Sequence, residues 1–137
     1  MSKYQLPPAV LQKEIKYMRW CGGIDCIAVP FSSELEHNSV EVLAKLVGDI
    51  LKDNTGIPQS IEEKPGDRYE TLYGFQVRPN GTTNPFLHTP RYRVNATRIA
   101  PDSISEAKSL VVVMAEEKVC QHCAKSLEEL TEILSTL

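Results

Sequence analysis

Four cysteines in two close pairs place the strongest constraint on how this chain folds. The pairs are Cys21 with Cys26 and Cys120 with Cys123. Zinc in a structural site is typically held by thiolates at about 2.3 Å, and two short loops that each supply a pair of sulfurs commonly provide them. If all four residues bind one zinc ion, segments near the two ends of the chain meet in space.

Two other interpretations of these cysteines stay open. Cys120 and Cys123 form a Cys-x-x-Cys motif at the expected start of a helix, where the helix dipole favours the thiolate and therefore redox chemistry. Alternatively, the thiols are unlinked structural groups, as is common for a residue such as Cys26 within an apolar run. The zinc site is the interpretation that accounts for both pairs.

Length and composition are typical of one folded domain. The 137 residues are 42% hydrophobic and 24% charged, with a formal net charge of -3. Such a chain can bury a core without cross-links, and these proportions argue against disorder. No secretory signal and no run of about 20 apolar residues is visible, so we expect a cytoplasmic protein without a membrane segment. In a reducing compartment, paired cysteines are more often metal ligands or redox thiols than disulfides.

Periodic apolar residues predict an α+β fold. Helices are expected over segments with apolar residues at helical spacing, namely 8–19, 39–53 and 120–137. Strands are expected over segments that alternate or are continuously apolar, namely 24–31, 68–78, 91–99 and 110–114. Residues 1–137 are therefore expected to form a single α+β domain, a small mixed or antiparallel sheet of about four strands packed with three helices.

Two details of this arrangement follow from the patterns. The continuous apolar run at 110–114 is typical of a central strand buried on both faces, and the alternation in 68–78 and 91–99 predicts an antiparallel pair. Residues 62–67 contain Pro65-Gly66 and are expected to form a turn or exposed loop. The chain ends are expected to come together near the cysteines.

Positive charge is concentrated in one segment of the chain. Between Thr71 and Pro101 there is no acidic residue, and the segment contains four arginines, Arg78, Arg91, Arg93 and Arg98. Arg91 and Arg93 are two residues apart in an expected strand, so their side chains fall on one sheet face. Forked guanidinium groups in this arrangement suit a phosphate or carboxylate, while a solvated strand face is the plainer alternative. The four arginines are candidate anion ligands.

The segment around the second cysteine pair resembles the second zinc motif of the cytidine and tRNA adenosine deaminase superfamily. A buried strand, a short acidic loop, Cys120-x-x-Cys123 and Ala124-Lys125-x-Leu127 follow one another as in that motif, over about 20 of the 137 residues. The resemblance implies a further His or Cys ligand upstream and a glutamate that moves the proton. Residues 91–96, at the expected distance, contain neither, so an active deaminase is not favoured.

These features favour a non-catalytic binding or assembly protein that contacts a protein partner or forms a homo-oligomer. Val42 and Leu46 widen the apolar stripe of the expected central helix, which hints at a second contact. The alternatives are a zinc- or thiol-dependent enzyme, and a protein that sequesters a small anionic ligand through Arg91 and Arg93. Nucleic acid is not favoured as a partner, because the chain is acidic overall and lacks a basic helix.

Overall fold

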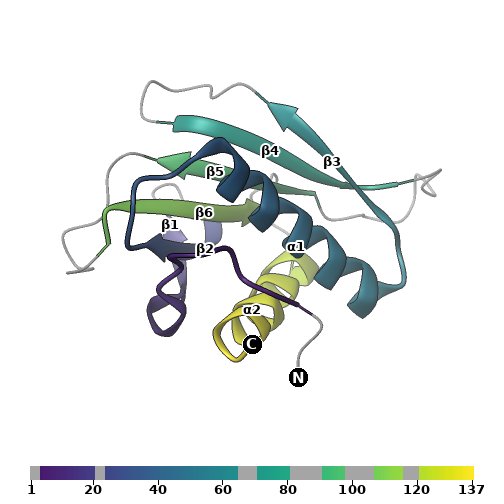
Figure 1. Cartoon of the computed structure of the whole chain (residues 1–137). Helices are drawn as coiled ribbons and strands as arrows, with labels where there is room; N and C mark the ends of the chain where they lie inside the picture. The colour runs from purple at the N-terminus through teal and green to yellow at the C-terminus, as the bar shows by residue number, and fades with distance from the viewer. Residues whose placement is uncertain (1–3, 21–23, 65–70, 81–90, 98–106, 116–120) are drawn as a thin grey trace.

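In the computed structural model, the described residues form one antiparallel sheet of six strands with two helices on one of its faces (Figure 1). The structure describes residues 4–20, 24–64, 71–80, 91–97, 107–115 and 121–137. The strands are β1 Lys16–Trp20, β2 Ile24–Phe31, β3 Gln59–Lys64, β4 Thr71–Pro79, β5 Tyr92–Thr97 and β6 Ser109–Ala115. They lie across the sheet in the order β1-β2-β6-β5-β4-β3, and every neighbouring pair is antiparallel.

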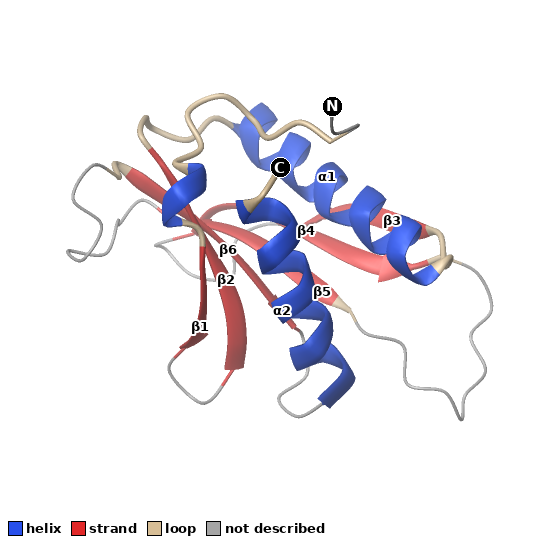
Figure 2. Ribbon diagram, turned by 90° about the horizontal axis from the view of Figure 1, so that it is seen from below, coloured by secondary structure: helices blue, strands red, loops and turns tan. Residues whose placement is uncertain are grey.

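Both helices pack on the same face of the sheet, side by side (Figure 2). Helix α1, His37–Thr55, covers β3, β4 and β5, whereas α2, Gln121–Ser135, covers β1, β2 and β6. Helix α1 ends at Gly56, which has a left-handed backbone (φ 74°) that glycine adopts without a steric penalty. Among the described residues, neither helix is long and apolar enough to cross a membrane.

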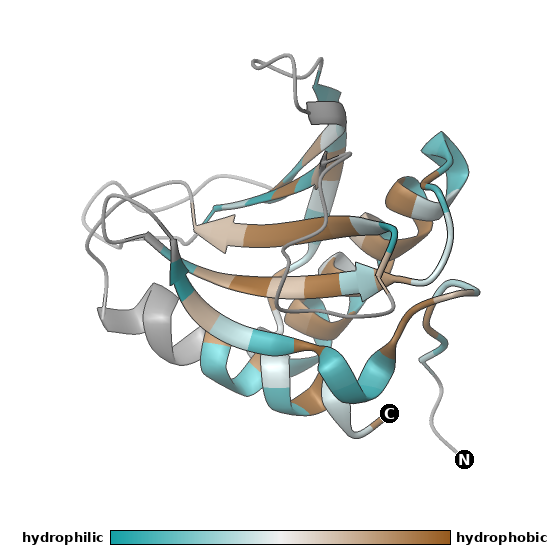
Figure 3. Cartoon of the chain, turned by 90° about the vertical axis from the view of Figure 1, so that its left-hand side faces the viewer, coloured by the Kyte–Doolittle hydropathy of each residue, from teal (hydrophilic) through white to brown (hydrophobic). Residues whose placement is uncertain are grey.

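The main core lies between the two helices and the sheet face that they cover. Strand residues that alternate toward the helices are buried there, among them Ile27, Val29, Phe75, Val77, Val94, Val111 and Val113. The helices contribute their own apolar sides, with Leu43, Val47, Ile50, Leu127, Leu130 and Leu134 fully or almost fully buried. Figure 3 shows the outer sides of the helices as mostly hydrophilic. Each large apolar side chain buried in this way contributes roughly 1.5–3 kcal/mol to stability.

The α+β fold and several elements agree with the expectations from the sequence. Strand β2 has the predicted bounds, and β6 lies at the centre of the sheet between β2 and β5. The antiparallel pairing of β4 with β5 is confirmed. Helix α1 is also confirmed. Of the two residues expected to widen its apolar stripe toward a second contact, Leu46 is buried in the core and Val42 alone is exposed.

The helix predicted at 8–19 is wrong. This segment contains a single 3-10 turn, η1 Gln12–Glu14, followed by strand β1. Leu11, Ile15 and Met18 have helical spacing, but Tyr17 and Trp20 favour a strand, and β1 gains a full antiparallel pairing with β2. Long-range pairing therefore overrides the local pattern. The described structure has two α-helices rather than three.

The loop predicted at 62–67 is also wrong in its first part, because β3 extends to Lys64. The sequence of β3 does not show the alternation of apolar and polar residues that predicts a strand, because Ile61 is its single apolar residue. It lies at the edge of the sheet, where charged residues such as Glu62 and Glu63 remain exposed to solvent. Charged edge strands also prevent pairing with other chains. With β1 and β3, the part of the sheet that the structure describes has six strands instead of about four.

One contact joins residues from near the two ends of the chain. The side-chain amide Nε2 of Gln12 donates to the carbonyl oxygens of Leu134 and Leu137, at 3.1 and 2.9 Å. This contact lies at the C-terminal end of α2, whereas Cys123 is in its first turn. A helix of 15 residues is about 20 Å long, so this contact lies away from Cys123. Cys21 and Cys120 lie outside the described residues, so the expected meeting of the chain ends near the cysteines stays a prediction.

Candidate functional site

The sheet face opposite to α1 and α2, called the helix-free face below, carries the chemically most informative residues. Directly opposed residues of antiparallel strands point to the same face. The pairing register places six side chains in one row on this face, one from each strand of the sheet. In the order of the strands across the sheet they are Met18, Cys26, Met114, Arg93, Gln76 and Glu62. Their chain neighbours, such as Ile27 and Val94, point into the main core.

The helix-free face has an apolar half and a polar half. On β2 and β6, Cys26, Ala28, Leu110 and Val112 form a second small core with exposures of 0–4%. Met18 and Met114 are partly buried and pack against it. On β3, β4 and β5 the described side chains of this face are polar or charged, namely Ser60, Glu62, Lys64, Gln76, Arg78, Arg93 and Asn95. An apolar surface and a polar surface therefore meet between β6 and β5.

In the polar half, a buried amide positions an arginine. Gln76 is only 1% exposed, although neither α1 nor α2 covers its side of the sheet. Its Oε1 accepts hydrogen bonds from Nε and Nη2 of Arg78, at 3.1 and 2.6 Å. The two residues are two apart in β4 and so share a face. Because an arginine has further N–H groups, the guanidinium of Arg78 keeps donors for a ligand.

Arg91 and Arg93 lie beside this pair. Arg93 is directly opposite Gln76, and Tyr92 is opposite Val77. One more step along the same register places Arg91, just before β5, opposite Arg78. Arg78, Arg91 and Arg93 thus form a group at one corner of the helix-free face, called the arginine corner below. Arg98, the fourth candidate anion ligand, lies outside the described residues.

Among the described residues, acidic groups do not neutralise the whole arginine corner. Glu62 on β3 is directly opposite Gln76 and is exposed to solvent. Within the described residues, neither Arg78 nor Arg91 forms an ion pair. Arg91 is exposed, and Arg78 and Arg93 are partly buried. The corner therefore presents positive charge to solvent.

The candidate zinc ligands are only partly within the described structure. Cys26 is fully buried in the apolar half of the helix-free face. Cys21 and Cys120 lie outside the described residues, as does the side chain of Cys123, so their arrangement stays a prediction. Among the described residues, no three or more His, Cys, Asp or Glu side chains gather as a metal site.

The topology nevertheless brings the neighbours of these cysteines to one end of the molecule. Trp20 pairs with Ile24 at the end of the β1–β2 hairpin, and Cys26 pairs with Met114 near the end of β6. Figure 2 shows the start of α2 at this same end. The chain positions next to both cysteine pairs thus lie at the same end of the molecule, and the zinc site stays a prediction.

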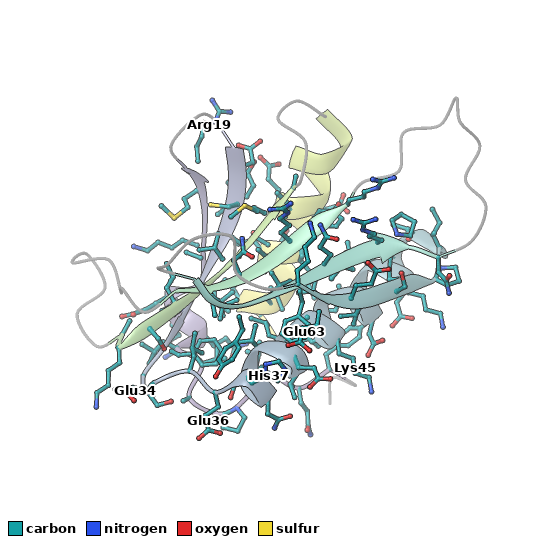
Figure 4. The ribbon with its side chains drawn as sticks, turned by 90° about the horizontal axis from the view of Figure 1, so that it is seen from above. Arg19, Glu34, Glu36, His37, Lys45 and Glu63 are labelled. Carbon is teal, nitrogen blue, oxygen red and sulfur yellow. The ribbon has the colours of Figure 1, made fainter. Side chains whose placement is uncertain are left out.

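One polar contact on the helix side was missed by sequence reasoning. His37 begins α1, and its Nε2 lies 3.5 Å from Oε1 of Glu63 on β3 (Figure 4). The imidazole ring packs edge-on against Tyr73, with centroids 4.9 Å apart, and tilted against Phe75 at 5.4 Å. The contact connects α1 with the edge of the sheet. The sequence patterns do not predict β3, so they could not place its residue Glu63 beside His37.

A second group of polar contacts lies within the β1–β2 hairpin, on the sheet face that α2 covers. Burial raises the pKa of Tyr17 from 10.0 to about 12, and the hydrogen bond and charge of Asp25 and the charge of Glu128 act in the same direction. Nε of Arg19 lies 3.3 Å from Oδ1 of Asp25. Tyr17, Arg19 and Asp25 point to the helix side of the sheet, opposite to the helix-free face.

Comparison with protein-family models, curated proteins and solved structures found no match. The chemistry of the helix-free face is therefore the basis for a functional proposal. Its distinguishing features are an oriented guanidinium, two neighbouring arginines and an adjoining buried apolar half.

Proposed function

We propose that this protein is a non-catalytic binding protein that holds a phosphate or carboxylate group at the arginine corner. The pairing of Gln76 with Arg78 is the observation that carries the proposal. A guanidinium that is already held by a buried amide loses less side-chain freedom when it binds an anion. Charge-assisted hydrogen bonds to such a ligand contribute roughly 1.5–3 kcal/mol each.

The chemistry of arginine supports binding rather than catalysis at this corner. Arginine stays protonated in proteins, so its side chain provides constant positive charge and hydrogen-bond donors but does not act as a general base. Its planar fork matches the oxygens of phosphate and carboxylate groups. Arg78, Arg91 and Arg93 together supply more donors than one such group can use, which allows a ligand with two anionic groups.

Binding can be tested with simple anions and matched variants. We expect inorganic pyrophosphate or citrate to shift the NMR amide signals of β4 and β5, with weaker binding at high salt. Arg78→Gln and Arg93→Gln should each weaken binding about tenfold through the loss of a charged hydrogen bond. Gln76→Leu should have a similar effect because it releases the Arg78 fork. Equal affinity in all variants would contradict the proposal.

Arg19→Gln is the matched control. Arg19 is exposed and lies on the helix side of the sheet beside Asp25, so this variant should bind the anions as the unchanged protein does. A similar loss in Arg19→Gln would indicate a general charge effect and would count against the arginine corner.

The experiment also distinguishes the source of the anionic group. Binding of pyrophosphate but not citrate indicates a phosphate-bearing small molecule. Binding of a polyglutamate peptide, with weak response to both small anions, indicates an acidic protein partner. Self-association through this face would appear in light scattering as a dimer that Arg78→Gln and Arg91→Gln together dissociate.

A further inference from the structure

The apolar half of the helix-free face contains three sulfur-bearing side chains in direct succession. Met18 on β1, Cys26 on β2 and Met114 on β6 occupy directly opposed positions. Such residues have Cβ atoms about 4.5–5.5 Å apart, so a thioether on either side can reach the thiol between them. Both methionines pack against the small core that contains Cys26. In Figure 4 the sulfur atoms of the described side chains gather over these strands.

We propose that Met18, Cys26 and Met114, called the sulfur row below, bind one copper(I) ion. Thiolate and thioether sulfurs are soft ligands, and they select Cu(I) over hard cations such as magnesium or calcium. The residues come from adjacent strands of one sheet, so the ligands are held by rigid backbone. This site shares no residue with the arginine corner, although Arg93 of that corner is directly opposite Met114.

Charge balance favours a monovalent metal ion here. One Cys26 thiolate neutralises one Cu(I) ion, and the thioethers are uncharged, so the bound site has no net charge. This matters because Cys26 is 0% exposed, and an unpaired charge is costly in such a position. Zinc(II) with the same three ligands would leave a positive charge, and the next side chain in the row is the cationic Arg93.

Binding requires no change of oxidation state. The S–H bond of Cys26 breaks, its proton passes to solvent, and a Cu–S bond forms, while each thioether donates a lone pair. Because a proton is released, Cu(I) affinity should rise with pH. Met18 and Met114 are only partly buried, and their unbranched side chains can move to admit the ion.

The test isolates the sulfur row from the other thiols. Cys21, Cys120 and Cys123 are changed to serine, and the reduced chain is titrated without oxygen with Cu(I) held by the chelator bathocuproine disulfonate. We expect one Cu(I) per chain, with thiolate-to-copper charge-transfer absorption in the near ultraviolet. Met18→Leu with Met114→Leu should lower the affinity about tenfold or more, and Cys26→Ser should abolish binding.

Two controls keep the outcome clear. Leucine is close to methionine in volume, so the double Met→Leu variant should fold like its parent, as circular dichroism will verify. An equimolar addition of Zn(II) should not displace Cu(I) from the sulfur row. Failure to bind Cu(I), an affinity unchanged by the Met→Leu pair, or displacement by Zn(II) would each overturn the proposal.

A second measurement covers the case in which the serine variant does not fold. X-ray absorption of the full chain with one equivalent of Cu(I) should show three sulfur neighbours around copper, and fewer in the Met→Leu pair. An identical spectrum in the two proteins would place copper elsewhere and overturn the assignment. Loss of anion binding by Arg78→Gln has no bearing on either readout.

Discussion

At the residue scale, two glycines differ in what an added methyl group would meet. A Cβ at Gly48 in α1 would lie 3.5 Å from Cδ1 of Ile61 and 3.7 Å from Cβ of Gln59, which are ordinary contacts. At Gly74 in β4 it would lie 3.0 Å from the carbonyl oxygen of Lys64 and 3.3 Å from Oδ1 of Asn95. The first site has room for a methyl group, and at the second a methyl group would press against a backbone oxygen of β3.

The two alanine substitutions should therefore have opposite effects. Gly48→Ala should raise the free energy of unfolding by about 0.5–1 kcal/mol, because alanine is the better helix former. Gly74→Ala should lower it by about 1–3 kcal/mol through overpacking against a backbone oxygen. Urea unfolding of both variants and the parent protein measures the difference. A Gly74→Ala protein as stable as its parent would contradict the geometry.

At the element scale, the β1–β2 hairpin is held against the rest of the fold partly by the uncharged form of Tyr17. Its pKa is about 12 in the folded protein, against 10.0 for an ordinary tyrosine, mainly because of burial. The folded state thus retains the phenol proton at a pH where the unfolded chain has lost it. The stabilisation is fully present below pH 10 and is lost as the pH rises toward 12.

Tyr17→Phe should remove the loss of stability that ionisation of Tyr17 causes at high pH, because phenylalanine has no ionisable hydroxyl group. Other groups also titrate at high pH, so the relevant quantity is the difference between the two proteins. We expect the free energy of unfolding, measured in urea at intervals between pH 8 and pH 12, to fall less steeply in Tyr17→Phe above about pH 10. Parallel curves across this interval would show that Tyr17 does not contribute.

The elements that could be predicted from the sequence are those whose own residues decide their structure. Helix α1 has a continuous apolar stripe, and β6 is a continuous apolar run. Strands β1 and β3 are at the two edges of the sheet, and they form because a partner strand supplies hydrogen bonds. Local periodicity contains no information about that partner.

The same distinction applies to the candidate site. That Arg91 and Arg93 share a face follows from the two-residue repeat of a strand, which is visible in the sequence. The placement of Arg78 beside them, and the succession of Met18, Cys26 and Met114, depend on strand order and register. These contacts join residues far apart in the chain, so no pattern of neighbouring residues predicts them.

At the scale of the whole molecule, the predicted zinc ion would connect the β1–β2 hairpin with the start of α2. Elemental analysis of the purified protein should then find one zinc per chain, bound by Cys21, Cys26, Cys120 and Cys123. Removal by a chelator should lower Tm by about 5 °C or more, since metal bound to the folded state alone stabilises it. A metal-free protein with four reactive thiols would contradict this prediction.

Cys26 decides between the zinc site and the sulfur row. If the four cysteines act as one site, Cys26→Ser should reduce the zinc content as strongly as Cys120→Ser does. Zinc that survives Cys26→Ser, but not Cys120→Ser, would show that Cys26 is not a zinc ligand. The two variants should be compared at the same protein and metal concentrations.

The central pairing of β2 with β6 has a consequence for folding kinetics. Phe31 is opposite Ser109, so the middle of the sheet closes only after most of the chain has been synthesised. Contacts between such distant segments slow folding, typically to the range of milliseconds to seconds. Until β6 arrives, the apolar strand β2 has an open edge, which is a site for aggregation. Chains truncated before residue 109 should therefore depend on chaperones to stay in solution.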